Sequence, residues 1–390
     1  MKKYGILIIG MAMKKILCVI ASLVMLFTLA FGLSACGDGK DGVSVETSYI
    51  DSDGNLIIKL TDGREINCGK VESDESFYYT AVCEDGQTVS YTVRSIGSVS
   101  DAEIIIPAEY KGKPVTAIGE NAFFNCKYIT GVTLPDTVET IGDNAFNGCE
   151  RLISVDLGEG VKTIGDGAFA YCHSLEAVEI PSSARTLGSD VFADCYSLSR
   201  AVINEGVERI GRSVFTGCNA LEEVNFPDTI AGVGEDENGD FSMTATFMNC
   251  VSLKRVKLPA RIEYIPQWFF AGCIQLETVE IGKSVKSVGY SAFFDNGAMQ
   301  SIVLPASLVT CESYSFYKLY SLESVFFEGT AAQWEAIEIG RLDSGGTPLA
   351  ARSTIGDMFG ESVTVYFYSE SRPTEEGSFW RYVNGKPVKW

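Results

Sequence analysis

Seven cysteines recur at one place in a repeated pattern, and thiolates are side chains that can bind zinc or pair as disulfides. Each stands three residues after a phenylalanine: Cys126, Cys149, Cys172, Cys195, Cys218, Cys250 and Cys273. Thiolate zinc sites use close pairs such as Cys-x-x-Cys, and none occurs here. Asn296 and Leu319 take the same place in two later repeats. We therefore predict that this cysteine column consists of buried free thiols. Cys68 and Cys83, outside the column, remain candidates for a disulfide.

His173 is the only histidine, so any imidazole chemistry would depend on it. It shares its place in the pattern with Lys127, Glu150 and Tyr196, which indicates an exposed and unspecialised position. A Ser-His-Asp or Cys-His set needs a histidine held beside a nucleophile by an orienting group. Nothing in the sequence supplies that arrangement. We predict no catalytic residue and no cofactor, and an enzyme is the least favoured class of function.

Two further segments carry side chains that bind ligands in other proteins. Residues 235–243 form an insertion with six polar oxygen-bearing side chains, but the closing glutamate of a calcium loop is missing. We interpret the insertion as a solvated surface loop and predict no metal. The aromatic residues Trp380, Tyr382 and Trp390 could stack on sugars, although packing onto the last repeat is the favoured alternative.

The N-terminus has the pattern of an export signal. Lys14 and Lys15 precede an apolar run over residues 16–33, and the run ends in Leu33-Ser34-Ala35-Cys36. These last four residues resemble a bacterial lipobox. The resemblance implies that Cys36 is lipidated and becomes the N-terminus of an extracellular protein anchored to the cell membrane. The alternative is an uncleaved helix, because the run is just long enough to span a bilayer.

The charge of the chain limits its partners. The formal net charge is −20, and it becomes −24 without residues 1–35, which hold four lysines and no acidic residue. Binding to phosphate backbones or anionic lipid headgroups needs Lys and Arg to displace counterions. Nucleic acid is therefore excluded as the expected partner.

A repeat of 23 residues fills the middle of the chain. Phenylalanines follow one another at this interval from Phe123 to Phe215 and, after an insertion, from Phe247 to Phe316. Within one unit, Val155 and Leu157 alternate with polar residues, which predicts a strand with one buried face. A period of 20 to 29 residues with leucine-like spacing is typical of leucine-rich repeats, whose coils must stack to bury their apolar faces. We predict an α/β or mainly β solenoid with one parallel sheet on the concave face and small β caps.

The segments around Ile118-Gly119-Glu120-Asn121-Ala122-Phe123 and Ile141-Gly142-Asp143-Asn144-Ala145-Phe146 resemble the BspA-like leucine-rich repeat family of bacterial surface proteins. The resemblance covers roughly residues 102–330. It implies adhesion or binding to a host or neighbouring-cell surface protein, and it brings no catalytic motif.

The domain organisation follows from these segments. The predicted parts are a signal peptide (1–35), a tether (36–42), an N-terminal β-hairpin stalk or cap (43–101), the repeat solenoid (102–330) and a C-terminal cap (331–390).

The outward positions of the concave strands vary while the buried positions do not, which makes this face the candidate binding site. The predicted ligand-binding residues are Glu223, Arg255, Lys257, Glu280, Asp156, Glu179 and Asn225. The first four would form a mixed-charge patch beside the insertion. Binding or adhesion is the first hypothesis. The alternative is a structural spacer that displays its C-terminal segment without tight binding.

Overall fold

The computed structural model describes residues 45–50, 55–60, 65–73, 76–84, 87–96, 102–233, 244–340, 358–359, 362–374 and 376–390, with side chains from residue 76 onward. Residues 1–44, with the predicted signal peptide and Cys36, and the insertion 235–243 lie outside this set. In the described part, no helix is long and apolar enough to cross a membrane.

The chain divides into two compact units, of which the first ends near residue 98. This N-terminal unit is a β-meander. Neighbouring strands pair antiparallel from β1 to β4. The strands are β1 (Val45–Ile50), β2 (Asn55–Leu60), β3 (Glu65–Ser73), β4 (Phe77–Glu84) and β5 (Gln87–Ile96). Cys83 on β4 is an exposed free thiol.

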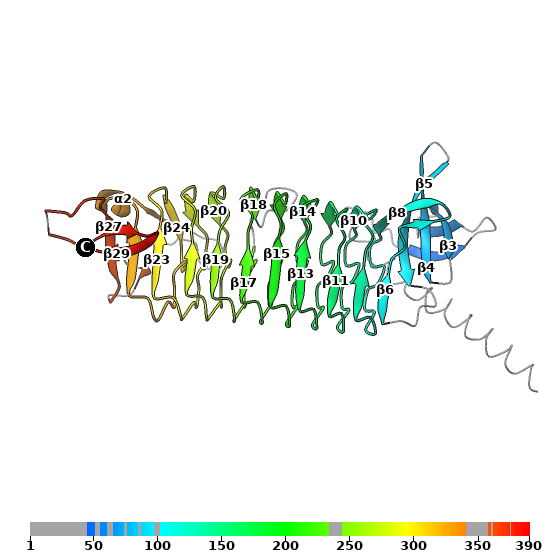
Figure 1. The fold of residues 1–390 in the computed structure, drawn as a ribbon, viewed down its shortest axis with the longest axis horizontal. Helices are drawn as coiled ribbons and strands as arrows, with labels where there is room; N and C mark the ends of the chain where they lie inside the picture. Colours follow the sequence, from blue (N-terminus) through cyan, green and yellow to red (C-terminus); the bar gives the residue numbers. More distant parts are fainter. Residues whose placement is uncertain are drawn as a thin grey trace, which may run out of the picture. The chain divides into compact units, whose positions relative to one another are not determined.

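The second unit is the predicted solenoid, in which each repeat contributes a strand to a first parallel ladder (Figure 1). Strands pair in register one repeat apart, as Arg200 with Glu223 and Glu223 with Arg255 do. The strands are β6 (Glu103–Ile105), β9 (Gly131–Thr133), β11 (Ser154–Asp156), β13 (Ala177–Ile180), β15 (Arg200–Ile203), β17 (Glu223–Asn225), β19 (Arg255–Lys257), β21 (Thr278–Glu280), β23 (Ser301–Leu304) and β25 (Ser324–Phe327). The strand pairing of this ladder is interrupted between β11 and β13 and again between β21 and β23.

The predicted solenoid is confirmed, and the return path of each repeat also builds a second parallel ladder that the sequence analysis did not predict. It starts after the short hairpin of β7 (Glu109–Tyr110) and β8 (Lys113–Ile118). Its strands are β8, β10 (Thr140–Ile141), β12 (Thr163–Ile164), β14 (Thr186–Leu187), β16 (Arg209–Ile210), β18 (Gly232–Val233), β20 (Tyr264–Ile265), β22 (Ser287–Val288), β24 (Thr310–Glu312) and β26 (Glu338–Gly340). The pairing is interrupted between β18 and β20, where the insertion enters.

The repeat phenylalanines form one continuous stack between the two ladders. Each is buried, and neighbouring ring centroids lie 4.9 to 5.7 Å apart along the array. Phe215 and Phe247 are 5.6 Å apart although the insertion separates them in sequence, so the insertion leaves the core intact. Phe359, from the C-terminal segment, continues the stack at 4.9 Å from Phe316.

The cysteine column is buried and unpaired, as predicted. From Cys149 onward each thiol donates a hydrogen bond to the carbonyl of a phenylalanine one repeat back, at 3.0 to 3.3 Å. The buried thiol therefore has a hydrogen-bond partner, and the phenylalanine carbonyl accepts one more hydrogen bond than it would without the cysteine. Asn296 takes the place of cysteine in the next repeat, and its buried amide has no hydrogen-bond partner in the described structure.

The C-terminal segment packs onto the last repeat. It contains α2 (Ala331–Glu335), β27 (Thr364–Tyr368), β28 (Phe379–Val383) and β29 (Lys386–Lys389), and β27 extends the first ladder beyond β25. The turn at Asn384-Gly385 joins β28 and β29 into an antiparallel hairpin. Trp380 is fully buried and its Nε1 donates to the Phe327 carbonyl at 2.9 Å, which supports packing over sugar stacking for this residue.

Candidate functional site

The first ladder exposes one side of its strands, which we call the strand face. All seven predicted binding residues are exposed on it: Glu223, Arg255, Lys257, Glu280, Asp156, Glu179 and Asn225. Strand alternation causes this, because Val224 and Val256, between the charged residues, point into the core. The face ends at the last repeat, where Phe326 is covered by Tyr366 and Trp380.

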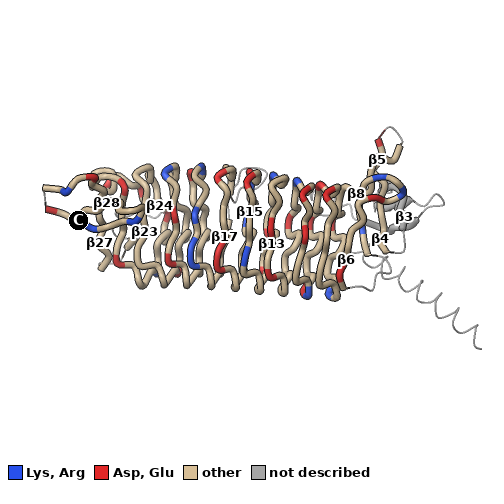
Figure 2. The backbone as a smooth tube through the Cα atoms, in the orientation of Figure 1, with Lys and Arg blue, Asp and Glu red and all other residues tan. Residues whose placement is uncertain are grey.

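Opposite charges alternate across the strand face between β15 and β19. Arg200, Glu223 and Arg255 occupy paired positions on adjacent strands, and Lys257 pairs in register with Glu280 on β21. Figure 2 shows the resulting blue and red bands on consecutive strands. We call Arg200, Glu223, Arg255, Lys257 and Glu280 the strand-face patch. Arg200 was not among the binding residues predicted from the sequence.

The charges of the patch are largely unpaired. Lys257 lies 3.9 Å from Asp228, an exposed contact that contributes little. The other four side chains form no ion pair with any residue in the described part of the chain. Each is exposed, so its charge is available to a partner.

The other three predicted residues have local contacts instead. The Asn225 side chain exchanges two hydrogen bonds with the backbone of Ile203, at 3.0 and 2.9 Å, and so extends the edge of β15. Asp156 accepts from the Gly158 N–H, and Glu179 accepts from Asn204. Asp156, Glu179 and Asn225 therefore make local contacts. The other four predicted residues belong to the strand-face patch.

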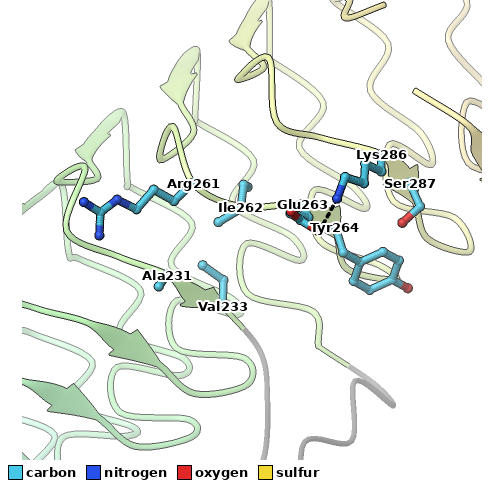
Figure 3. A pocket seen from close by; sticks show the side chains of 8 residues that line it. All are labelled: Ala231, Val233, Arg261, Ile262, Glu263, Tyr264, Lys286 and Ser287. Atoms are coloured by element: carbon cyan, nitrogen blue, oxygen red, sulfur yellow. Dashed lines mark hydrogen bonds and ion pairs between the residues drawn. The ribbon is translucent and has the colours of Figure 1, made fainter. Parts of the chain in front are cut away.

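The insertion affects the opposite ladder rather than the strand face. Strands β17 and β19 remain paired across the insertion at Glu223 with Arg255 and at Val224 with Val256, and the pairing stops before Lys257. An open depression of about 410 Å³ lies at the break between β18 and β20 (Figure 3). Its wall includes an ion pair of Lys286 with Glu263 at 2.7 Å, which neutralises both charges locally.

Groups suited to catalysis or metal binding do not converge on these surfaces. No three His, Cys, Asp or Glu side chains are placed to hold a metal among the described residues. His173 is half-buried rather than fully exposed, because it stacks on Tyr196 at 4.7 Å and meets the edge of Tyr171. Burial raises the pKa of the Cys126 thiol to about 12, which makes it a poor nucleophile.

The repeat geometry agrees with a comparison against protein families. The description "BspA type leucine rich repeat region" matches residues 116–237 and 243–337, in six copies. The chain belongs to this family. BspA-type repeats therefore account for both ladders and for the phenylalanine stack between them, and the family resemblance stated from the sequence is confirmed.

Solved structures with similar folds come from several bacteria. A leucine-rich repeat protein from Bacteroides ovatus is 25% identical, with 76% of this chain and 70% of that chain covered and a TM-score of 0.58. A leucine-rich repeat protein of T. pallidum is 23% identical, with 65% and 91% covered and a TM-score of 0.41. A leucine-rich cell surface protein from Faecalibacterium prausnitzii is 23% identical, with 69% and 97% covered and a TM-score of 0.30. No curated protein matches the chain.

Proposed function

We propose that this BspA-type protein is a non-enzymatic surface receptor or adhesin whose strand-face patch binds a host or neighbouring-cell surface protein. The observation that carries the proposal is the row of exposed, alternating charges Arg200, Glu223 and Arg255 on adjacent strands, which form no ion pair with a described residue. Such a row is complementary to a partner with alternating charges in the same register. Charge complementarity of this kind sets specificity and the association rate more than affinity.

Reversing the basic charges of the patch tests this function. Arg255→Glu combined with Lys257→Glu is expected to slow association with the partner about 10-fold, since steered association depends on the local field. The partner is sought first, by surface plasmon resonance of the mature chain over immobilised purified extracellular matrix and cell-surface proteins. The effect should shrink as salt is raised toward 1 M, where the Debye length falls to about 3 Å.

Lys162→Glu is the matched control, because Lys162 is an exposed lysine beside the second ladder, in an ion pair with Glu139. Equal binding by the patch variant and by this control would remove the strand-face patch from the proposal. A screen in which no protein binds would instead favour the spacer alternative.

The membrane anchor is the second part of the proposal, and it rests on the sequence at Leu33-Ser34-Ala35-Cys36. Cys36→Ser is expected to move the protein from the membrane fraction to the soluble extracellular fraction, because the acyl chains supply the stable anchoring. Fractionation and mass spectrometry of the N-terminal peptide provide the measurement. A Cys36→Ser protein that stays in the membrane with residues 16–33 attached would show a transmembrane anchor instead.

A further inference from the structure

A cluster of aromatic side chains lies on the turns that follow strands β20, β22 and β24. We call Trp268, Tyr290, Phe294, Tyr314, Tyr317 and Lys318 the aromatic patch. Trp268 contacts Tyr290 and Phe294 at 5.4 and 5.9 Å between ring centroids. Tyr314 contacts Tyr290 at 5.8 Å and Tyr317 at 5.4 Å. The five rings therefore form one continuous surface across three repeats.

The patch is open to solvent. Tyr314 and Tyr317 are 49% and 50% exposed, and Trp268, Tyr290 and Phe294 are half-buried. The hydroxyls of Tyr290, Tyr314 and Tyr317 form no hydrogen bond with any residue that the structure describes. Each phenol thus offers a ring face and a free polar tip, the combination that suits a ligand with apolar and polar sides.

The solenoid does not need these aromatic residues, and its backbone disfavours two of them. Trp268 and Tyr314 have φ of 59° and 57°, in the left-handed region that bulky side chains avoid. Earlier repeats fill the same place with residues that tolerate it, such as Asn121, Asn144 and Gly167. The positive φ recurs at the turns throughout the array, including Tyr171 at 59°, so it belongs to the repeat turn and does not by itself mark a site. The aromatic side chains are therefore placed here at a cost to the turn.

We propose that the aromatic patch binds an extended, neutral glycan. A pyranose ring has apolar C–H faces and a rim of hydroxyls, which match the exposed ring faces and the free phenol hydroxyls. The rings of Trp268 and Tyr290 are inclined by 67°, and those of Tyr290 and Tyr314 by 86°. The rings are therefore steeply inclined to one another, and the patch is not one flat platform.

The charges near the patch select a neutral ligand. The Lys318 ammonium lies 4.8 Å over the Phe294 ring and already takes a cation–π position there, so a second cation would be repelled. The net charge of −20 disfavours a polyanion. Neighbouring turns are one repeat apart, about 4.8 Å. This spacing is close to the length of one sugar unit in an extended glycan. This surface is separate from the strand-face patch and does not depend on the protein-binding proposal.

The test uses the mature chain on a printed array of neutral oligomers of glucose, mannose, galactose and N-acetylglucosamine, beside sialylated and sulfated glycans. We expect binding to at least one neutral series. Tyr314→Ala combined with Tyr317→Ala should weaken it at least 10-fold, and Tyr314→Phe with Tyr317→Phe should weaken it less, because the rings remain. Tyr171→Ala with Tyr196→Ala removes two equally exposed tyrosines on other turns and should leave binding unchanged.

Thermal unfolding of each variant checks that these exposed substitutions leave the fold intact. Binding by charged glycans only, binding by no glycan, or equal loss in the Tyr171/Tyr196 control would overturn the proposal. So would a protein ligand that needs Tyr314 and Tyr317 while no neutral glycan binds. Arg255→Glu should leave glycan binding unchanged, so failure of the strand-face proposal is distinguishable from failure of this one.

Discussion

Replacing Phe169 with alanine is expected to destabilise the solenoid by about 3–5 kcal/mol, as truncation of a core aromatic residue does. Phe169 is fully buried, and its ring stacks at 5.1 Å on Phe146 and at 5.6 Å on Phe192. Removing the ring leaves a cavity that both neighbouring repeats border. The stack cannot close around this gap, because the second ladder on either side of Phe169 and the pairing of β13 with β15 fix the spacing of the repeats.

Urea unfolding followed by circular dichroism measures this loss. Tyr196→Ala is a suitable control, because it removes an aromatic ring that is 45% exposed and should change stability by only about 0.5 kcal/mol. A repeat array can unfold in more than one step, so the variant could show an early transition confined to the repeats around Phe169. A Phe169→Ala protein as stable as the control would contradict the stacked core.

The cysteine column is expected to resist thiol reagents in the native state far more strongly than Cys83 does. The thiolate is the reactive species, and burial raises the pKa of Cys126 from 9.0 to about 12. This shift lowers its thiolate fraction about 1000-fold at pH 8, and burial also blocks access. Alkylation at pH 8 followed by peptide mass spectrometry should label Cys83 first and the column only in denaturant.

Raised thiol pKa values also predict how the free energy of unfolding depends on pH. Burial raises the pKa of Cys195 to about 12 in the folded state, whereas the unfolded thiol keeps a value near 9.0. The thiols therefore contribute their full stability below pH 9, and the contribution is lost as pH rises toward 12. Cys172→Ala with Cys195→Ala should show a smaller fall in melting temperature between pH 8 and pH 10. Labelled column thiols in the native protein, or disulfides among them, would contradict the buried column.

Much of the fold could be predicted because each position of the repeat occurs many times in the sequence. The period placed Phe169 and Cys172 in the interior, and the alternation around Val155 located the first ladder. The second ladder escaped prediction because strands of two residues, such as Thr163–Ile164, are too short for a periodic signal. Phe359 escaped it as well, since it joins the stack from a segment that lacks the 23-residue spacing.

The strand-face patch could be predicted in part. The fixed period brings Glu223 and Arg255 to adjacent strands even across the insertion, and alternation turns both outward. The contacts of Asn225 could not be foreseen, because a side chain that bonds to neighbouring backbone looks like any polar residue in a sequence column. The aromatic patch was missed because turn positions were treated as solvated, although Trp268 and Tyr314 stand where other repeats have Asn or Gly.

The uniform phenylalanine stack has a consequence for how such a chain changes over evolutionary time. Phe146 meets Phe123 much as Phe192 meets Phe169, so every junction between repeats presents nearly the same surfaces. An in-frame duplication or deletion of one repeat therefore joins surfaces that already fit, and needs no compensating substitution in the core. The length of the array can vary by recombination within the gene, while the outward residues of each new copy are free to diverge.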